Sequence, residues 1–85
     1  MTQDKPISWM ALKDGTPVLS SDGSEVGKIT EVVADHSKDI FSGIRFRHGL
    51  FGSEHFAPAD TIAAITEDDV TLSLSASEAQ SLDGS

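Results

Sequence analysis

The feature that most constrains this chain is the segment from residue 40 to residue 60, where two alternating runs flank a glycine-bounded reversal. In the first run, residues 40–47, successive side chains alternate between two sets, one at the even positions and one at the odd positions. This period of two is typical of a β-strand with one face in a core. Residues 48–52 supply the reversal, and residues 54–58 run back. The segment therefore predicts a β-hairpin, with the rest of the chain arranged around it as shorter strands.

The same alternation predicts how the two hairpin strands face. One face of the first strand carries the set Ile40, Ser42, Ile44 and Phe46. In the returning strand, Phe56 lies on the core face, and His55 and Ala57 lie on the other face. We therefore expect Phe56 to pack in the interior.

Four further short strands are predicted on either side of the hairpin. They cover residues 16–19, 25–33, 63–66 and 70–75. In the second of these, Val26 and Ile29 are an odd number of residues apart, so a regular strand cannot bury both. A bulge or sharp bend at Gly27–Lys28 would bring both into the interior.

Helical spacings occur at both ends of the chain. Trp9 and Leu12 are three residues apart, as on one helical turn, and we expect this arm to lay Trp9 across an open end of the sheet. Ser75 and Glu78 have the spacing of a capping box, which predicts a short helix through Leu82. The predicted division is an N-terminal arm, a β domain, and a helix with a tail, over residues 1–14, 15–75 and 76–85.

Six short strands without a long helical period predict an all-β fold, a small six-stranded antiparallel β-barrel with a short C-terminal helix. One core is expected to contain Val18, Val26, Ile29, Ile44, Phe46, Phe56, Ile65, Leu72 and Leu74.

Composition excludes several classes of function. The 85 residues include 14 acidic and six basic side chains, for a net charge of −8. Nucleic-acid binding is unfavourable at this charge, because phosphate contacts need clustered Lys and Arg. The chain has no cysteine, no run that could span a bilayer and no signal-peptide pattern. We expect a cytoplasmic protein that is complete as it stands and does not insert into a membrane.

Two longer stretches resemble the PRC-barrel domain family. The first half of the pattern is Pro17-Val18, Ser21-Asp22-Gly23, Val26-Gly27-Lys28-Ile29 and Val32-Val33-Ala34-Asp35. The second half is Gly43-Ile44, Gly49-Leu50-Phe51-Gly52, His55-Phe56, Pro58-Ala59-Asp60, Ile62, Ile65 and Asp69-Val70-Thr71-Leu72.

This family includes the cytoplasmic domain of the photosynthetic reaction-centre H subunit and the C-terminal domain of the ribosome maturation factor RimM. The resemblance implies a β-barrel used for protein–protein contact, and it implies no catalytic residues. The chain lacks the transmembrane helix of the H subunit and the partner domain of RimM, so it is most similar to the single-domain members.

The candidate site residues point to binding rather than to catalysis. No nucleophile–base set and no phosphate-binding glycine loop is visible, and we expect no cofactor. His48 and His55 flank the hairpin reversal and, with Glu54 nearby, could form a weak metal site. A third protein ligand is not evident, so surface or interface histidines are the favoured interpretation. We therefore expect no metal site.

The favoured contact residues lie on and around the hairpin. Arg45 and Arg47, the two arginines of the chain, share one face and either pair with nearby carboxylates or recognise an acidic partner. Leu50 and Phe51 at the tip are either exposed anchors or buried by curling of the hairpin. The predicted interaction residues are Arg45, Arg47, His48, Leu50, Phe51 and His55.

We expect a non-enzymatic interaction or adaptor module that forms a homodimer or binds another protein. The alternative is an RNA- or ribosome-associated accessory protein, which would need a basic surface that extends beyond the two arginines.

Overall fold

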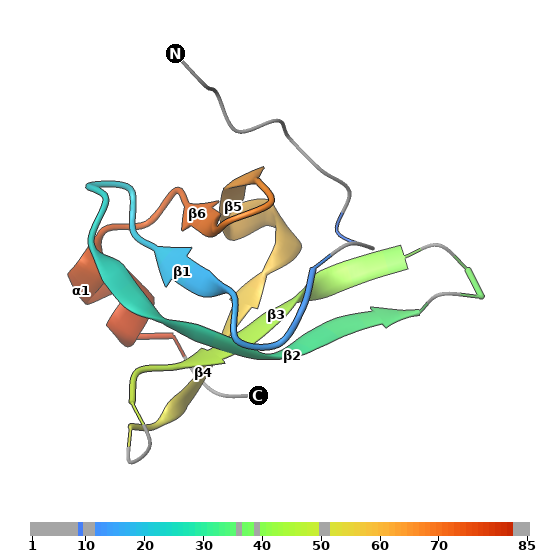
Figure 1. Ribbon diagram of the computed structural model, residues 1–85, viewed down its shortest axis with the longest axis horizontal. Coiled ribbons are helices and arrows are strands. Elements are labelled where there is room, and N and C mark those ends of the chain that lie inside the picture. Colours follow the sequence, from blue (N-terminus) through green and yellow to red (C-terminus); the bar gives the residue numbers. More distant parts are fainter. Residues whose placement is uncertain (1–8, 10–11, 36, 39, 50–51, 83–85) are drawn as a thin grey trace.

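The computed structural model describes residue 9 and residues 12–35, 37–38, 40–49 and 52–82. From residue 17 onward, the described residues form six strands, a 3₁₀ turn and a helix (Figure 1). They are β1 (Pro17–Leu19), β2 (Glu25–Asp35), β3 (Ile40–Arg47), β4 (Glu54–Pro58), η2 (Ala59–Thr61), β5 (Ile62–Ile65), β6 (Val70–Leu72) and α1 (Ala76–Gln80). The six predicted strands and the C-terminal helix are therefore confirmed, with small shifts at their ends.

The strands form one sheet in the order β4-β3-β2-β1-β6-β5, and this sheet is not closed. The prediction of a closed barrel is therefore wrong. The prediction that all strands are antiparallel is also wrong, because β1 and β6 pair in parallel. The remaining neighbours pair antiparallel. The turn η2 explains why the sheet contains both parallel and antiparallel pairs. It carries the chain from β4 at one margin to β5 at the other without a hairpin reversal, so β6 reaches β1 pointing the same way (Figure 1).

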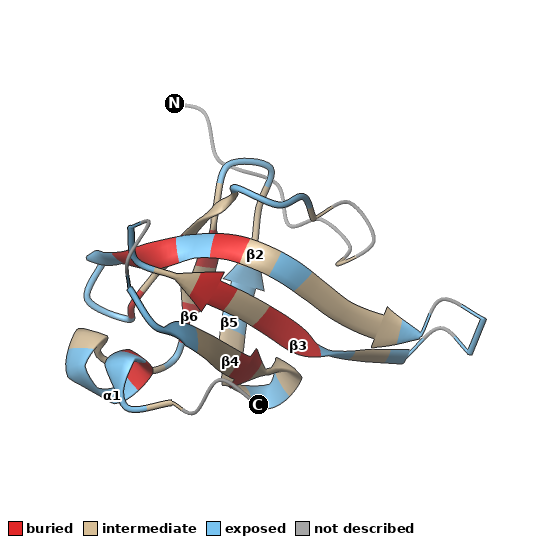
Figure 2. Ribbon diagram, turned by 90° about the horizontal axis from the view of Figure 1, so that it is seen from below, coloured by how far each residue is buried: buried red, intermediate tan, exposed pale blue. Residues whose placement is uncertain are grey.

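A single hydrophobic core lies against the inner face of the curved sheet and under α1 (Figure 2). It consists of Val18, Val26, Ile29, Ile44, Phe46, Ala57, Val70, Leu72 and Ala79. Six of these residues were predicted from the sequence. The predicted members Ile65 and Leu74 are half-buried and pack against this cluster.

The prediction for the facing of β4 is wrong. Ile44 pairs with Ala57 and Phe46 pairs with His55, so Ala57 and His55 lie on the core side. Phe56 pairs with Arg45 and lies on the opposite face. The register with β3 decides the facing, because a shift of one residue moves every side chain to the other face. The methyl group of Ala57, which is fully buried, fills the interior position expected for the Phe56 ring.

Irregular pairing adjusts β2 and β3 to the core. Val26 and Ile29 are both buried, as predicted, but the unpaired residue opposite β1 is Val26 rather than a residue of the Gly27–Lys28 pair. In β3, the pairing with β2 skips Ser42. This skip turns Phe41 toward the core and leaves Ile40 51% exposed, although the alternation grouped Ile40 with Ile44.

Trp9 and helix α1 both pack against the sheet. The Trp9 ring stacks on Phe41 with ring centroids 5.4 Å apart. In the capping box, the Ser75 N–H donates to Glu78 Oε1 at 2.9 Å, and the Glu78 N–H donates to Ser75 Oγ at 3.2 Å. Helix α1 ends at Gln80, two residues before the predicted end, and Ala79 anchors it to the core.

The turn between β1 and β2 depends on one buried hydroxyl. Ser20 is fully buried, and its Oγ donates a hydrogen bond to Asp22 Oδ1. The main chain closes the same turn, because the Gly23 N–H donates to Ser20 O at 3.0 Å. The hydroxyl lowers the pKa of the Asp22 carboxyl below its ordinary value of 3.8.

Ser20→Ala should raise the pKa of Asp22 and lower the free energy of unfolding at neutral pH. A carboxyl whose pKa is lower in the folded state stabilises the fold above its ordinary pKa, and the contribution disappears as the pH falls through the folded-state value. Ser20→Ala should therefore flatten the dependence of stability on pH below about 4. NMR titration of Asp22 and urea unfolding test this. Ser21→Ala, at an exposed neighbour, is the control, and an unchanged Asp22 pKa in Ser20→Ala would contradict the assignment.

Candidate interaction surface

The face of β2, β3 and β4 that points away from the core carries both apolar and charged side chains. The strand registers place these residues in three rows across the three strands. The rows are Val33–Gly43–Pro58, Glu31–Arg45–Phe56 and Lys28–Arg47–Glu54. We call these nine residues the outward face.

The middle row contains an ion pair beside an aromatic ring. Arg45 Nη1 donates to Glu31 Oε1 at 3.0 Å, and the two side chains are 34% and 56% exposed. A pair this exposed contributes little to stability. Its effect is to hold the guanidinium along the sheet, where Arg45 Nε is buried without a hydrogen-bond partner among the described residues.

Gly43 makes room for the Phe56 ring. A Cβ atom at Gly43 would lie 2.9 Å from Phe56 Cζ and 2.2 Å from the Ala57 carbonyl oxygen, so the ring and β4 both approach the bare backbone. Phe56 is half-buried and is not among the side chains packed against the core. With half-buried Val33 and Pro58 in the neighbouring row, it forms an apolar centre on the outward face.

The third row holds two positive charges and one carboxylate. Lys28 and Arg47 are direct cross-strand partners, and Glu54 is the partner of Arg47 on the other side. The Glu54 carboxylate accepts a hydrogen bond from the Thr30 hydroxyl. Within the described part of the chain, neither Lys28 nor Arg47 forms an ion pair.

The structure brings together only part of the predicted set of interaction residues. Arg45 and Arg47 share the outward face, and His48 is exposed just beyond β3. The predicted anchors Leu50 and Phe51 lie outside the described residues.

His55 does not join this group, which corrects the prediction. Its ring lies against Phe46 with centroids 5.4 Å apart, and its Nδ1 is 2.7 Å from the Leu82 carbonyl oxygen. His55 therefore holds the segment after α1 against β4. Among the described residues, no group of three His, Cys, Asp or Glu side chains could hold a metal ion.

Sequence reasoning missed the apolar centre because it assigned Phe56 to the core. The alternation in β4 also allows the opposite facing, in which Ala57 and His55 lie on the inner face. A five-residue strand that alternates His, Phe and Ala satisfies either facing, and only the pairing with Ile44 and Phe46 decides between them.

Residues 12–80 match the profile of a family described as "Uncharacterized protein conserved in bacteria (DUF2171)". The match covers most of the chain, and the chain belongs to this family. No curated protein matches the chain significantly. In the portion that the structure describes, no helix has the length and apolar character needed to cross a membrane.

Proposed function

We propose that this DUF2171 member is a non-enzymatic protein–protein interaction module of the PRC-barrel type, and that it pairs with a second copy of itself through the outward face. The observation that carries this proposal is the apolar centre formed by Phe56, Val33 and Pro58. These side chains lie on the face of the sheet opposite the core, with charged residues beside them.

The energetic argument starts from the small core. A chain of this size buries only roughly 60–65% of its unfolded surface, so additional apolar burial has a large effect on stability. At about 25 cal/mol per Å², an interface that hides a few hundred Å² of apolar surface adds several kcal/mol. Pairing over Phe56 would supply such burial without changing the fold of either copy.

The charges of the outward face suit a partner with an identical face. The face carries Lys28, Arg45 and Arg47 together with Glu31 and Glu54. Two-fold pairing, the commonest arrangement of identical chains, can place the basic side chains of one copy against the acidic side chains of the other. This local match offsets the repulsion expected between two chains of net charge −8.

The proposal gives the described histidines no catalytic role. His55 contacts a main-chain carbonyl oxygen, and neither His55 nor His48 hydrogen-bonds to a hydroxyl group within the described segments. A serine nucleophile needs such a base beside it. The resemblance to PRC-barrel domains, which implies protein contact and no catalytic residues, agrees with this interpretation.

The alternative RNA-associated function has weaker support. Lys28 and His48 extend the basic surface beyond the two arginines, as that function requires. Glu31 and Glu54 interrupt the same surface, however. Backbone phosphates are bound by clusters of uninterrupted positive charge, so the mixed surface favours a protein partner.

Phe56→Glu should convert the dimer to a monomer, because it places a carboxylate at the apolar centre. The matched control is Ile40→Glu, which also replaces a large apolar side chain with glutamate, at the exposed far end of β3. Sedimentation velocity at a concentration at which the wild type is dimeric measures the effect, with circular dichroism to verify folding. Phe56→Ser is the milder second variant if the glutamate unfolds the domain. A folded Phe56 variant that remains dimeric would contradict the proposed interface.

A further inference from the structure

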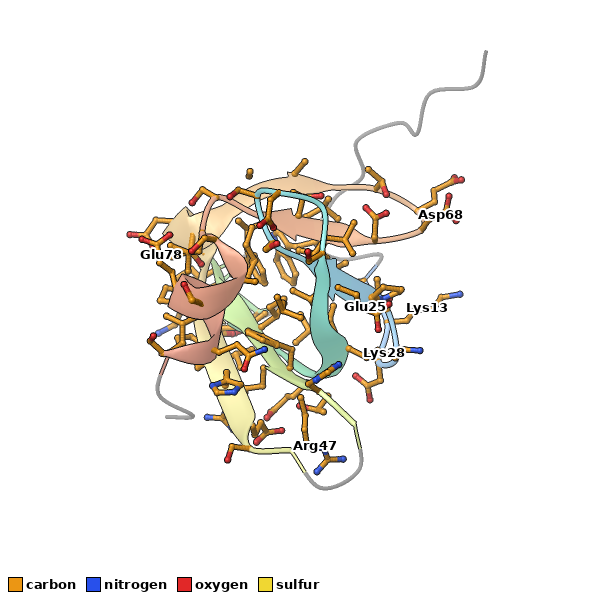
Figure 3. All side chains as sticks on the ribbon, turned by 90° about the vertical axis from the view of Figure 1, so that its left-hand side faces the viewer. Lys13, Glu25, Lys28, Arg47, Asp68 and Glu78 are labelled. Carbon is orange, nitrogen blue, oxygen red and sulfur yellow. The ribbon has the colours of Figure 1, made fainter. Side chains whose placement is uncertain are left out.

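A cavity of about 520 Å³ opens at the end of β2 and β3 next to the hairpin reversal. Two of its lining residues, Lys28 and Arg47, carry positive charge, and Glu25 lines it as well. The three side chains are labelled in Figure 3. The remaining lining residues are Gly27, Ile29, Thr30, His48 and Gly49. Its volume lies within the range of roughly 300–1,000 Å³ that is typical of small-molecule sites.

The two positive charges that line this cavity form no ion pair among the described residues. Lys28 lies directly opposite Arg47 in an antiparallel pair, and like charges in that position destabilise a sheet. Glu54 is the cross-strand partner of Arg47, but its carboxylate accepts a hydrogen bond from the Thr30 hydroxyl and forms no ion pair with Arg47. In a chain with 14 acidic residues, this pair has no carboxylate partner among the residues that the structure describes.

Two glycines shape the cavity. A Cβ atom at Gly27 would lie 2.7 Å from the Arg47 carbonyl oxygen, so glycine allows the two strands to approach here. Gly49 has a φ of +78°, and no described atom apart from its two chain neighbours lies within 4 Å of the position that its Cβ would take. Both glycines therefore line the cavity without a side chain that would fill it.

We infer that this cavity binds a small molecule through a carboxylate or phosphate group held between Lys28 and Arg47. The guanidinium can donate two parallel hydrogen bonds to such a group, and the ammonium adds a point charge. A bound oxyanion would remove the repulsion between the two cations. Glu25 disfavours a second negative group near it, so we expect the rest of the ligand to be neutral or basic. Lys28 and Arg47 also belong to the outward face, so a second copy paired over this row would compete with the ligand for them.

The test is an NMR titration of the full chain with inorganic phosphate and, separately, with acetate. Saturable shifts of the Gly27, Arg47 and Gly49 amide signals are the expected result, and the stronger of the two probes identifies the preferred group. Lys28→Gln and Arg47→Gln should each weaken binding by about tenfold, the loss expected for one charge-assisted contact. Lys38→Gln is the matched control, because it removes the same charge from the exposed turn between β2 and β3.

Two results would overturn the inference. One is the absence of saturable shifts with both anions. The other is equal weakening by Lys38→Gln, which would indicate only general charge attraction. A hexaglutamate peptide is the third ligand, and binding of this peptide without binding of either small anion would show that the cavity receives a protein side chain instead.

Discussion

Ile44→Ala is expected to lower the free energy of unfolding by about 2–5 kcal/mol, the usual range for removing a large aliphatic side chain from a core. Ile44 is fully buried and pairs with Val32 on one side and with Ala57 on the other. A domain this small has a total stability of only a few kcal/mol, so much of the variant should be unfolded.

Ile40→Ala is the matched control for this prediction. It makes the same change on the same strand, but Ile40 is 51% exposed. Its effect should stay within about 1 kcal/mol, as at other surface positions. Urea unfolding followed by circular dichroism measures both variants. Equal losses from Ile40→Ala and Ile44→Ala would show that the facing of β3 is wrong.

Gly43→Ala should lower the free energy of unfolding by at least as much as Ile44→Ala does, although it adds only one methyl group. The new Cβ would lie 2.2 Å from the Ala57 carbonyl oxygen and 2.9 Å from the Phe56 ring, so β4 would have to move. Gly43 also has a φ of +151°, a conformation that side-chain-bearing residues rarely adopt. Together, overpacking and backbone strain predict a loss of about 2–5 kcal/mol.

Gly23→Ala separates these two contributions. Gly23 also has a positive φ, of +89°, but no described atom apart from its two chain neighbours lies within 4 Å of its Cβ position. Only backbone strain applies there, and we expect a loss of about 1 kcal/mol. The same unfolding measurement compares the two glycines. If Gly43→Ala were no more harmful than Gly23→Ala, the close approach of β4 to Gly43 would be refuted.

The local features of the fold could be predicted because the determinants lie within a few residues of one another. The strands β3 and β4 pair antiparallel as predicted for the hairpin, since alternation and a glycine-bounded reversal define both strands. Ser75 and Glu78 form the predicted capping box, because its two hydrogen bonds require only that spacing. The buried positions of Val18, Ile44 and Leu72 follow from alternation in the same way.

The features that the sequence did not predict depend on contacts between distant strands. Residues 59–61 form the turn η2, but their sequence does not show that the chain crosses from one margin of the sheet to the other there. The parallel pairing of β1 with β6 is a consequence of that crossing. In β4, the register with Ile44 and Phe46 sets the facing, and the hydrophobicity of Phe56 alone does not.

The same distinction applies to the candidate site. Strand alternation was enough to place Arg45 and Arg47 on one face. The apolar centre around Phe56 was missed because its position depends on the space above Gly43 in the neighbouring strand. His55 was misplaced for the related reason that its partner, the Leu82 carbonyl oxygen, is 27 residues away in the sequence.

Sedimentation equilibrium of the wild-type chain across the micromolar range is the most direct test of the proposed function. Self-association through the outward face predicts twice the chain mass of 9.0 kDa, with dissociation to single chains on dilution. A mass of one chain at every concentration would contradict the proposal that this protein pairs with a second copy of itself.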